Sequence, residues 1–311
     1  MMSEGMMIFQ AACLTIIGAA TPLLFAALGE LVAERSGVLN LGVEGMMLVG
    51  AVGGFVGAVV TGNTYIGILI GGLAGVLLAA LHALLTLSLL TNQVATGLAI
   101  TLFGVGLSAL IGSEFVGTTV EPLSNLPIPL LSDIPLLGPI LFDHNLMIYL
   151  SVVMVVGLHF FIYHSRGGLV LRAIGESPES AHALGYPVIK LRYLALLFGG
   201  LMAGLGGAYL SVVYTPMWSE NMTAGRGWVA LALVVFATWK PGRVLLGAYM
   251  FGGVTILQLH GQGFGLAIPS QFMSMLPYLA TVLVLVMISS DKVKLKENSP
   301  ASLGKVFRPS I

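Results

Sequence analysis

Charged residues are scarce in this sequence. Lys, Arg, Asp and Glu together make up 8% of its 311 residues, against roughly a quarter in an ordinary globular domain. A soluble protein of this length needs many more charges to cover its surface, whereas a protein surrounded by lipid does not, because its outer surface is apolar. The 57% of hydrophobic residues and the 41 glycines fit the second class. We therefore predict an all-α integral membrane protein.

Other absences exclude further classes of protein. The formal net charge is zero, so no basic field points to nucleic acid. Cys13 is the single cysteine, which rules out an internal disulfide and indicates a small apolar core residue. No lysine is followed by serine or threonine, so the glycine-rich phosphate loop of many ATPases is missing. We expect no catalytic residue, no metal site and no cofactor bound by this chain; if ATP supplies energy, another polypeptide hydrolyses it.

Long charge-free stretches define the architecture. A helix needs about 20 apolar residues to cross a bilayer, and these stretches predict a polytopic bundle of about eight to ten transmembrane or part-spanning helices. They run over residues 7–29, 45–60, 65–91, 94–113, 145–163, 193–218, 227–239, 244–259 and 272–290. No basic run precedes the first stretch, and it is too long for the core of a signal peptide, so we interpret it as a retained helix.

Basic residues gather on one side of this predicted bundle. If the tail from Asp291 is cytoplasmic and the spans alternate, with 227–239 and 244–259 taken as a pair, every basic residue except Arg226 falls inside. This distribution satisfies the positive-inside rule. It predicts a transmembrane domain over residues 1–290 and a basic cytoplasmic tail over residues 291–311.

Two stretches interrupt the regular pattern. In residues 34–47, polar residues and glycines break an apolar run. The stretch 227–239 gives only about 20 Å of helix against a hydrocarbon core of about 30 Å, and Lys240-Pro241-Gly242 should stop it. We therefore expect it to be re-entrant or packed inside the bundle. The triplet Arg35-Ser36-Gly37, followed by Leu-Gly, is echoed by Lys240-Pro241-Gly242, also followed by Leu-Gly, which suggests an internal duplication.

Polar residues near these breaks are candidate pore or gate residues. An intramembrane carboxylate is expensive unless it is paired or hydrated, so Glu44 is the first of them. The full set is Asn40, Glu44, Asn92, Gln93 and Thr96. Two simpler interpretations stay open: Glu44 bonds backbone groups near the cytoplasmic surface, and Asn92 only caps a helix. Glu30 and Glu34 are expected at the interface with lipid headgroups.

Small residues four apart recur along the predicted spans. Such pairs let helix backbones approach closely in lipid, where no hydrophobic effect holds helices together. We predict tight bundle packing at Gly50/Gly54, Gly53/Gly57, Gly71/Gly75, Gly200/Gly204 and Ala203/Gly207.

The predicted cytoplasmic loop 165–192 contains a short helix with both ends marked. In GESPESAHALGYP, at residues 175–187, Ser177 is a good N-cap and Pro178 suits the first helical position. Gly185 can close the helix and Pro187 prevents its continuation. A helix of about seven residues is unstable alone in water. It is either a connecting helix against its own bundle or an element that docks on a soluble partner.

On the opposite side, residues 114–144 contain five prolines, which predict a stiff and partly extended outer loop. This loop could be a lid, a docking surface for a delivery protein or only a connector.

Four segments together resemble a known family. They are ERSGVLNLGVEGMM at 34–47, LPIPLLSDIPLLGPILFDHN at 126–145, GESPESAHALGYP at 175–187 and LPYLATVLVLVMIS at 276–289. The chain resembles bacterial ABC-importer permeases of the branched-chain amino acid and simple-sugar superfamily. It is most similar to the shorter of the two paired permeases in the nucleoside-importer branch.

The resemblance implies a permease subunit that forms half of the path for a small polar solute, here a nucleoside, in a bacterial inner membrane. Implied partners are a cytoplasmic ATP-binding subunit, a second and different permease, and an extracytoplasmic substrate-binding lipoprotein. The segment implied to couple to the ATPase comprises Glu176, Ser177, Pro178, Glu179, Ala181, Ala183, Leu184 and Gly185.

Two other functions are weighed against this one. An ion- or proton-coupled secondary transporter needs paired titratable groups at the bilayer midplane, and the cleanest spans hold only His82. An intramembrane protease needs a Ser-His pair, paired aspartates or a His-Glu-x-x-His motif, and none appears.

Overall fold

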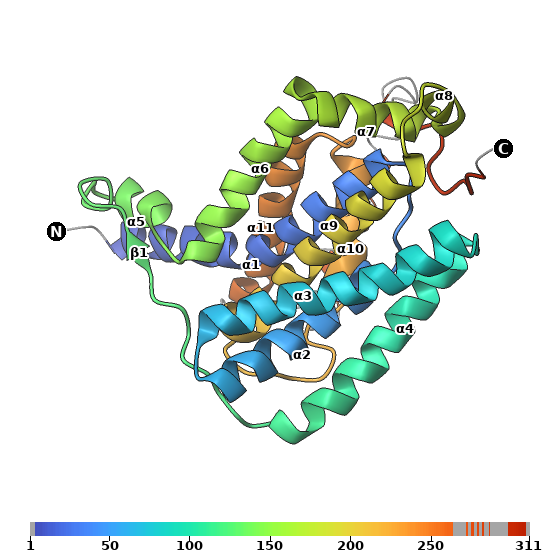
Figure 1. Cartoon of the computed structure of the whole chain (residues 1–311). Coiled ribbons are helices and arrows are strands. Elements are labelled where there is room, and N and C mark those ends of the chain that lie inside the picture. The colour runs from blue at the N-terminus through green and yellow to red at the C-terminus, as the bar shows by residue number, and fades with distance from the viewer. Residues whose placement is uncertain are drawn as a thin grey trace.

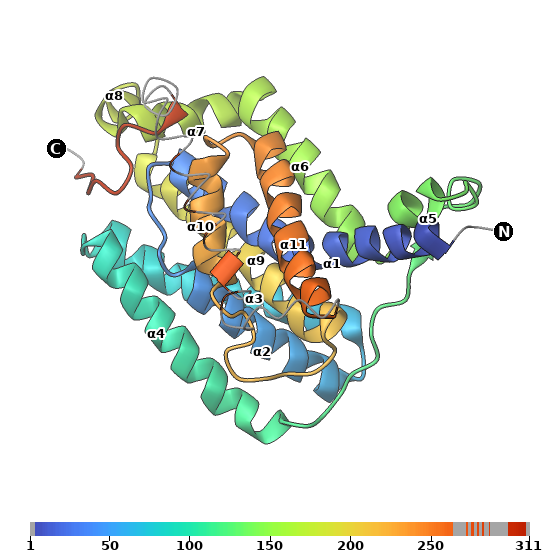
Figure 2. The same cartoon turned by 180° about the vertical axis from the view of Figure 1, so that it is seen from behind.

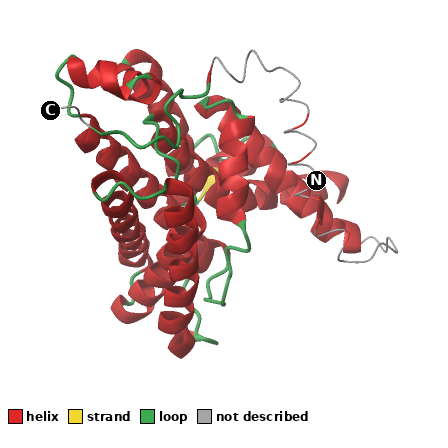
Figure 3. Ribbon diagram, turned by 90° about the vertical axis from the view of Figure 1, so that its right-hand side faces the viewer, coloured by secondary structure: helices red, strands yellow, loops and turns green. Residues whose placement is uncertain are grey.

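The structure is a computed structural model that describes residues 4–263 and 298–308, with a few single positions between them. Helix dominates this part of the chain (Figure 3). Six helices are long and apolar enough to cross a membrane, and two shorter apolar helices, α10 and α11, accompany them. This confirms the predicted all-α polytopic bundle, while the predicted stretch 272–290 lies outside the described residues and the internal duplication stays a prediction.

The long helices match the predicted spans closely. They are α1 (Glu4–Arg35), α2 (Val43–Thr61), α3 (Thr64–Ala83), α4 (Gln93–Gly112), α6 (Leu146–His164) and α9 (Val188–Ala208). Two of them continue as a π-helical turn, at Leu84–Ser88 after α3 and at Tyr209–Tyr214 after α9. The short apolar helices are α10 (Arg226–Phe236) and α11 (Pro241–Gly263).

The connections lie at two opposite ends of the bundle (Figure 1). The N-terminus, the α2–α3 turn and the segment after α4 lie at one end. The α3–α4 connection, α7 (Arg166–Glu176), α8 (Pro178–Ala183) and the C-terminal residues lie at the other end. This division matches the alternation predicted from the charges.

The predicted outer loop is only partly extended. It holds a short 3-10 turn (Ser113–Phe115), β1 (Leu126–Pro127), α5 (Leu137–Phe142) and β2 (Asp143–His144), and β1 pairs with β2 in antiparallel register. A bridge between Thr119 and Met217 joins the loop to the segment that follows α9. The prolines therefore do not exclude helix here, because α5 needs only a turn and a half and takes Pro139 in its first turn.

Glycines bring α2, α3 and α9 into direct backbone contact at the centre of the bundle. A Cβ placed on Gly71 of α3 would lie 2.6 Å from the carbonyl oxygen of Gly50 in α2 and 2.6 Å from Cβ of Ala208 in α9. One placed on Gly75 would lie 2.8 Å from Cα of Gly204 in α9. Side chains at these positions would force the helices apart. The predicted close packing at these glycines is confirmed.

The two predicted irregular stretches are also present. The first is a turn and extended segment over residues 36–42, between α1 and α2. The second separates the 11-residue α10 from α11, and Pro241 begins α11 because a missing N–H costs nothing at a helix N-terminus. Seen from behind, α10 and α11 lie side by side next to α1 (Figure 2).

Candidate functional site

The helix α8 forms as the sequence predicts. The Ser177 hydroxyl oxygen accepts a hydrogen bond from the backbone N–H of Ser180 at 3.3 Å, and Pro178 occupies the first helical position. Gly185 adopts φ +88°, and its N–H donates to the carbonyl of His182 at 2.8 Å. The N–H of Tyr186 donates to the carbonyl of Ala181 at 3.1 Å, which completes a closed C-terminal cap.

A second helix, α7, precedes α8 and was not predicted. Its N-cap is Ser165, whose hydroxyl oxygen accepts from the N–H of Gly168 at 3.0 Å. The apolar residues Leu171 and Ile174 face inward and are buried. Gly167 and Gly168 lower the helix propensity of this stretch and obscured the signal, although the Ser165 cap and the spacing of its apolar residues could have revealed it.

The residues implied to couple to an ATPase divide between two faces of α8. Pro178 and Ala181 are buried against the chain itself, and Ser177 is half-buried. The exposed ones are Glu176, Glu179, Ala183, Leu184 and Gly185. Leu184 is 78% exposed, in a loop at the end of the bundle that carries the basic residues. The structure thus leaves one side of the predicted coupling segment free to meet a partner.

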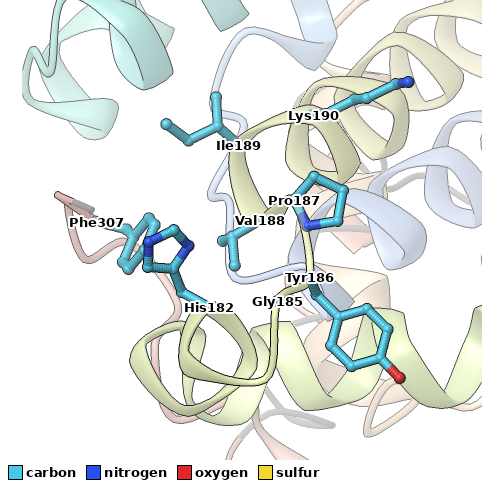
Figure 4. A pocket seen from close by; sticks show the side chains of 8 residues that line it. All are labelled: His182, Gly185, Tyr186, Pro187, Val188, Ile189, Lys190 and Phe307. Atoms are coloured by element: carbon cyan, nitrogen blue, oxygen red, sulfur yellow. The ribbon is translucent and has the colours of Figure 1, made fainter. Parts of the chain in front are cut away.

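A recess of about 270 Å³ lies between α8 and the start of α9 (Figure 4). Figure 4 shows the rings of His182 and Phe307 side by side, and their centroids are 5.8 Å apart. Phe307 comes from the C-terminal residues, so the far end of the chain forms part of this surface. The remaining residues that line the recess are Gly185, Tyr186, Pro187, Val188, Ile189 and Lys190.

Glu44 holds the N-terminus of α10. Its Oε1 accepts from the Thr223 hydroxyl at 2.6 Å and from the N–H of Gly225 at 2.8 Å, and its Oε2 accepts from the N–H of Gly227 at 2.6 Å. Glu44 is buried. A carboxylate is favourable there because the first N–H groups of a helix have no partner within the helix and carry partial positive charge.

The other end of α10 is held by the end of α1. The indole N–H of Trp239 donates to Oε2 of Glu34, and Nη2 of Arg35 donates to the carbonyl of Trp239 at 3.0 Å. Both carboxylates of this region, Glu30 and Glu34, are buried inside the chain, and their expected depth at the lipid headgroups stays a prediction. Glu30 accepts from the N–H of Asn40 at 3.1 Å.

Backbone strain flanks α10 on both sides. Asn221 and Ala224 before it, and Thr238 and Trp239 after it, have positive φ between 47° and 56°. Residues with a Cβ rarely adopt this region, and such outliers concentrate at switch regions and binding sites. The helix itself rises only about 16 Å over its 11 residues, about half of the ~30 Å of a hydrocarbon core.

The other candidate pore residues have ordinary partners. Oδ1 of Asn92 accepts from the N–H of Ala95 at 3.0 Å, so Asn92 caps α4. The Thr96 hydroxyl bonds that of Thr91 at 2.8 Å. Asn40 and Gln93 are buried, and Oε1 of Gln93 accepts from the N–H of Leu39, the residue before Asn40, at 2.8 Å.

Among the described residues, the hydrogen bonds of Asn92, Gln93 and Thr96 go to groups other than Glu44, and that of Gln93 fixes the loop 36–42. No group of three metal-ligating side chains occurs among the residues that the structure describes. What the arrangement offers is a buried polar framework around α10 and an exposed short helix, without a catalytic constellation.

Comparison with known proteins agrees with this architecture. Residues 12–288 match the model of the family described as branched-chain amino acid transport system / permease component. The chain is 45% identical to the putative glucose ABC transporter permease protein TsgC13 of Haloferax volcanii, over 90% of this chain and 92% of that protein.

Two further relatives are nucleoside permeases by name. Identity is 33% to the nucleoside ABC transporter permease protein NupC of Lactococcus lactis, over 85% of this chain and 88% of that one. It is 32% to the guanosine ABC transporter permease protein NupQ of Bacillus subtilis, over 86% and 88%. No solved structure matches the chain. With a family match over nearly its whole length, this multi-pass membrane protein belongs to the ABC-transporter permease components of the branched-chain amino acid transport family, which are not themselves enzymes.

Proposed function

We propose that this chain is one of two permease subunits of an ATP-driven importer and that a separate cytoplasmic ATPase docks on α8. The family match over residues 12–288 carries the first part of this proposal. The second part is supported by the exposed, doubly capped α8 at the end of the bundle where basic residues gather. In this assignment the second permease is a different chain, and a substrate-binding lipoprotein delivers solute on the side of the N-terminus.

The mechanism follows from a short helix that is firmly seated yet exposed on one side. Closure of the ATPase displaces α8, and the two permeases rock to open their shared path inward or outward. Within this chain, Glu44 bonds the N-terminus of α10 to the start of α2. The residues supply position and displacement, and hydrolysis takes place on the partner.

The proposed cargo is a nucleoside, delivered through a path that these two permeases share. The relatives named for nucleoside and guanosine transport support this choice, and the relative named for glucose makes a sugar the alternative. Uptake of radiolabelled guanosine and, in a parallel assay, of radiolabelled glucose into cells that express the whole importer, each with the other solute unlabelled as competitor, separates the two. Saturable guanosine uptake that glucose leaves unchanged is expected, whereas glucose uptake without guanosine uptake would identify a sugar importer.

The docking role is tested by charge on the exposed side of α8. Ala183 is exposed, and a Cβ on Gly185 would meet no atom within 4 Å, so the double variant Ala183→Glu/Gly185→Arg leaves the packing of the bundle intact. Its only internal cost is that of an L-residue with φ +88°, about 1–2 kcal/mol. We expect normal membrane insertion, loss of the co-expressed ATPase in a detergent pull-down and loss of uptake.

A matched control separates docking from the local cost at the cap. Gly185→Ala imposes a similar backbone cost with little bulk and no charge, because an alanine at φ +88° pays the same penalty as any other ordinary L-residue. It should retain the ATPase. Undiminished ATPase binding and uptake in the charged double variant would remove the docking proposal.

A further inference from the structure

The C-terminal residues join α7, α8 and α9 to the loop after α1. We call residues 298–308 the clasp. At its centre, Ser302 is buried; its N–H donates to the carbonyl of Gly175 at 2.9 Å, and its hydroxyl donates to the same carbonyl at 2.7 Å. Two residues further on, the N–H of Gly304 donates to the carbonyl of Gly37 at 3.2 Å. The clasp therefore bonds α7 and the extended loop at once.

Arg192 fixes this junction from α9. It is 1% exposed, its Nε donates to the carbonyl of Ser36 at 3.0 Å, and its Nη2 donates to the hydroxyl of Ser302 at 3.0 Å. A Cβ on Gly37 would collide with the Ser302 hydroxyl and lie 2.7 Å from Nη2 of Arg192. Charge-assisted bonds in a buried setting are stronger than those at a surface, so these elements are held in one arrangement.

At the other end of the clasp, Phe307 is buried against the docking region. It packs with Ile174 of α7, Ala181 of α8 and Val188 of α9. Its ring also lies beside that of His182 (Figure 4). The guanidinium carbon of Arg192 lies over the Phe307 ring, 5.9 Å from the ring centroid. Phe307 is thus the side chain through which the clasp contacts α8.

From the same junction, contacts continue to α10. Nη1 of Arg35 donates to the carbonyl of Asn298 in the clasp at 3.0 Å, and its Nη2 donates to the carbonyl of Trp239 at the end of α10. The far end of α10 is bonded to Glu44. A continuous series of packed and bonded groups therefore leads from α8 through the clasp to the strained segments that flank α10.

We propose that the clasp transmits the displacement of α8 to α10, with Phe307 as the positioning residue that makes the contact. This proposal rests on the proposed function, because it needs an ATPase that moves α8. It assigns a transport role to C-terminal residues that pack against the buried side of α8. The bonded ends of α10 and the positive φ values beside them make this short helix the element that responds.

The test compares Phe307→Ala with Val306→Ala in the complete importer, reconstituted in proteoliposomes with its ATPase, second permease and binding protein. Val306 is 42% exposed and adjacent, so it is a matched control for loss of an apolar side chain from the clasp. Uptake, ATP hydrolysis and retention of the ATPase are measured together. We expect Phe307→Ala to keep the ATPase and its hydrolysis while solute transported per ATP falls about fivefold or more. Val306→Ala should change none of these.

A second measurement needs no ATPase. Hydrogen exchange of the backbone of residues 36–42 in the isolated chain should accelerate in Phe307→Ala and in Ser302→Ala, and stay unchanged in Val306→Ala. Phe307→Leu, which restores an apolar contact, should recover part of the transport per ATP.

Several results would overturn the proposal. A parallel fall of uptake and hydrolysis would give Phe307 a merely structural role, and loss of the ATPase from Phe307→Ala would make it part of the docking surface. Unchanged transport per ATP in Phe307→Ala would directly contradict the transmitting role proposed for the clasp. Failure of the unsubstituted chain to retain any ATPase would instead count against the proposed function, and the transmitting role of the clasp, which depends on that function, would be refuted too.

Discussion

The contact of α2, α3 and α9 through glycine predicts a sharp loss of stability in Gly71→Ala. The new Cβ would lie 2.6 Å from the Gly50 carbonyl oxygen, 2.6 Å from Cβ of Ala208 and 3.1 Å from Cα of Gly54. Two of these neighbours are backbone atoms of α2, and the third belongs to α9, so no flexible side chain can move aside. Both helices must retreat by several tenths of an ångström before the methyl group fits.

The magnitude follows from two opposing terms. Overpacking of a well-packed interior costs about 1–3 kcal/mol, while alanine in place of glycine in a helix contributes up to about 1 kcal/mol of stability. Three contacts of 3.1 Å or less place the overpacking in the upper half of its range, so the net loss is about 1–2 kcal/mol. Gly157→Ala in α6 is the matched control, because a Cβ there meets nothing within 4 Å and only the favourable term remains.

Thermal unfolding of the detergent-solubilised chain, followed by fluorescence-detected size exclusion, measures both variants. Gly71→Ala should lower the apparent Tm by about 2–8 °C, and Gly157→Ala should leave it unchanged or raise it slightly. A Gly71→Ala protein as stable as the Gly157→Ala protein would refute the glycine-mediated contact.

Two further predictions concern the anchoring of α10 by Glu44 and the side of the membrane on which α8 lies. Glu44→Gln places an amide N–H₂ against the donors of Gly225, Gly227 or Thr223. Losing a charge-assisted bond in a buried site should cost about 2–3 kcal/mol, which should lower the Tm and reduce uptake. A Tm equal to that of the unsubstituted chain would show that Glu44 does not hold α10. Ser180→Cys in a Cys13→Ala background should react with a membrane-impermeant maleimide only after cells are opened, because α8 is predicted to be cytoplasmic; labelling in intact cells would reverse the orientation.

The fold could be predicted from the sequence where local signals determine it. Hydrophobic length located the long helices, and the caps at Ser177 and Gly185 located α8, since each is a property of neighbouring residues. The π-helical turns after α3 and α9 left no such signal. In α7 the Ser165 cap is such a signal, but the two glycines of the first turn oppose it.

The candidate site was only partly accessible from the sequence, because its contacts join residues far apart in the chain. Glu44 was singled out as a costly carboxylate, yet its partners at Thr223 and Gly227 lie about 180 residues further on, and no local pattern links them. The clasp was predicted only as a basic cytoplasmic tail. Its role as packing for α7 and α8 depends on Ser302 and Phe307, two unremarkable residues in a polar stretch.

The glycine-lined seam among α2, α3 and α9 also limits how this protein can move. Helices that touch backbone to backbone cannot slide past one another without losing that contact, so these three travel as one rigid block through any transport cycle. Movement must then be concentrated in the parts attached around this block, and α10 has the short length and the strained ends suited to that. In a permease with a rigid centre, a small displacement of a peripheral element such as α8 can produce a defined displacement of the residues that line the translocation path.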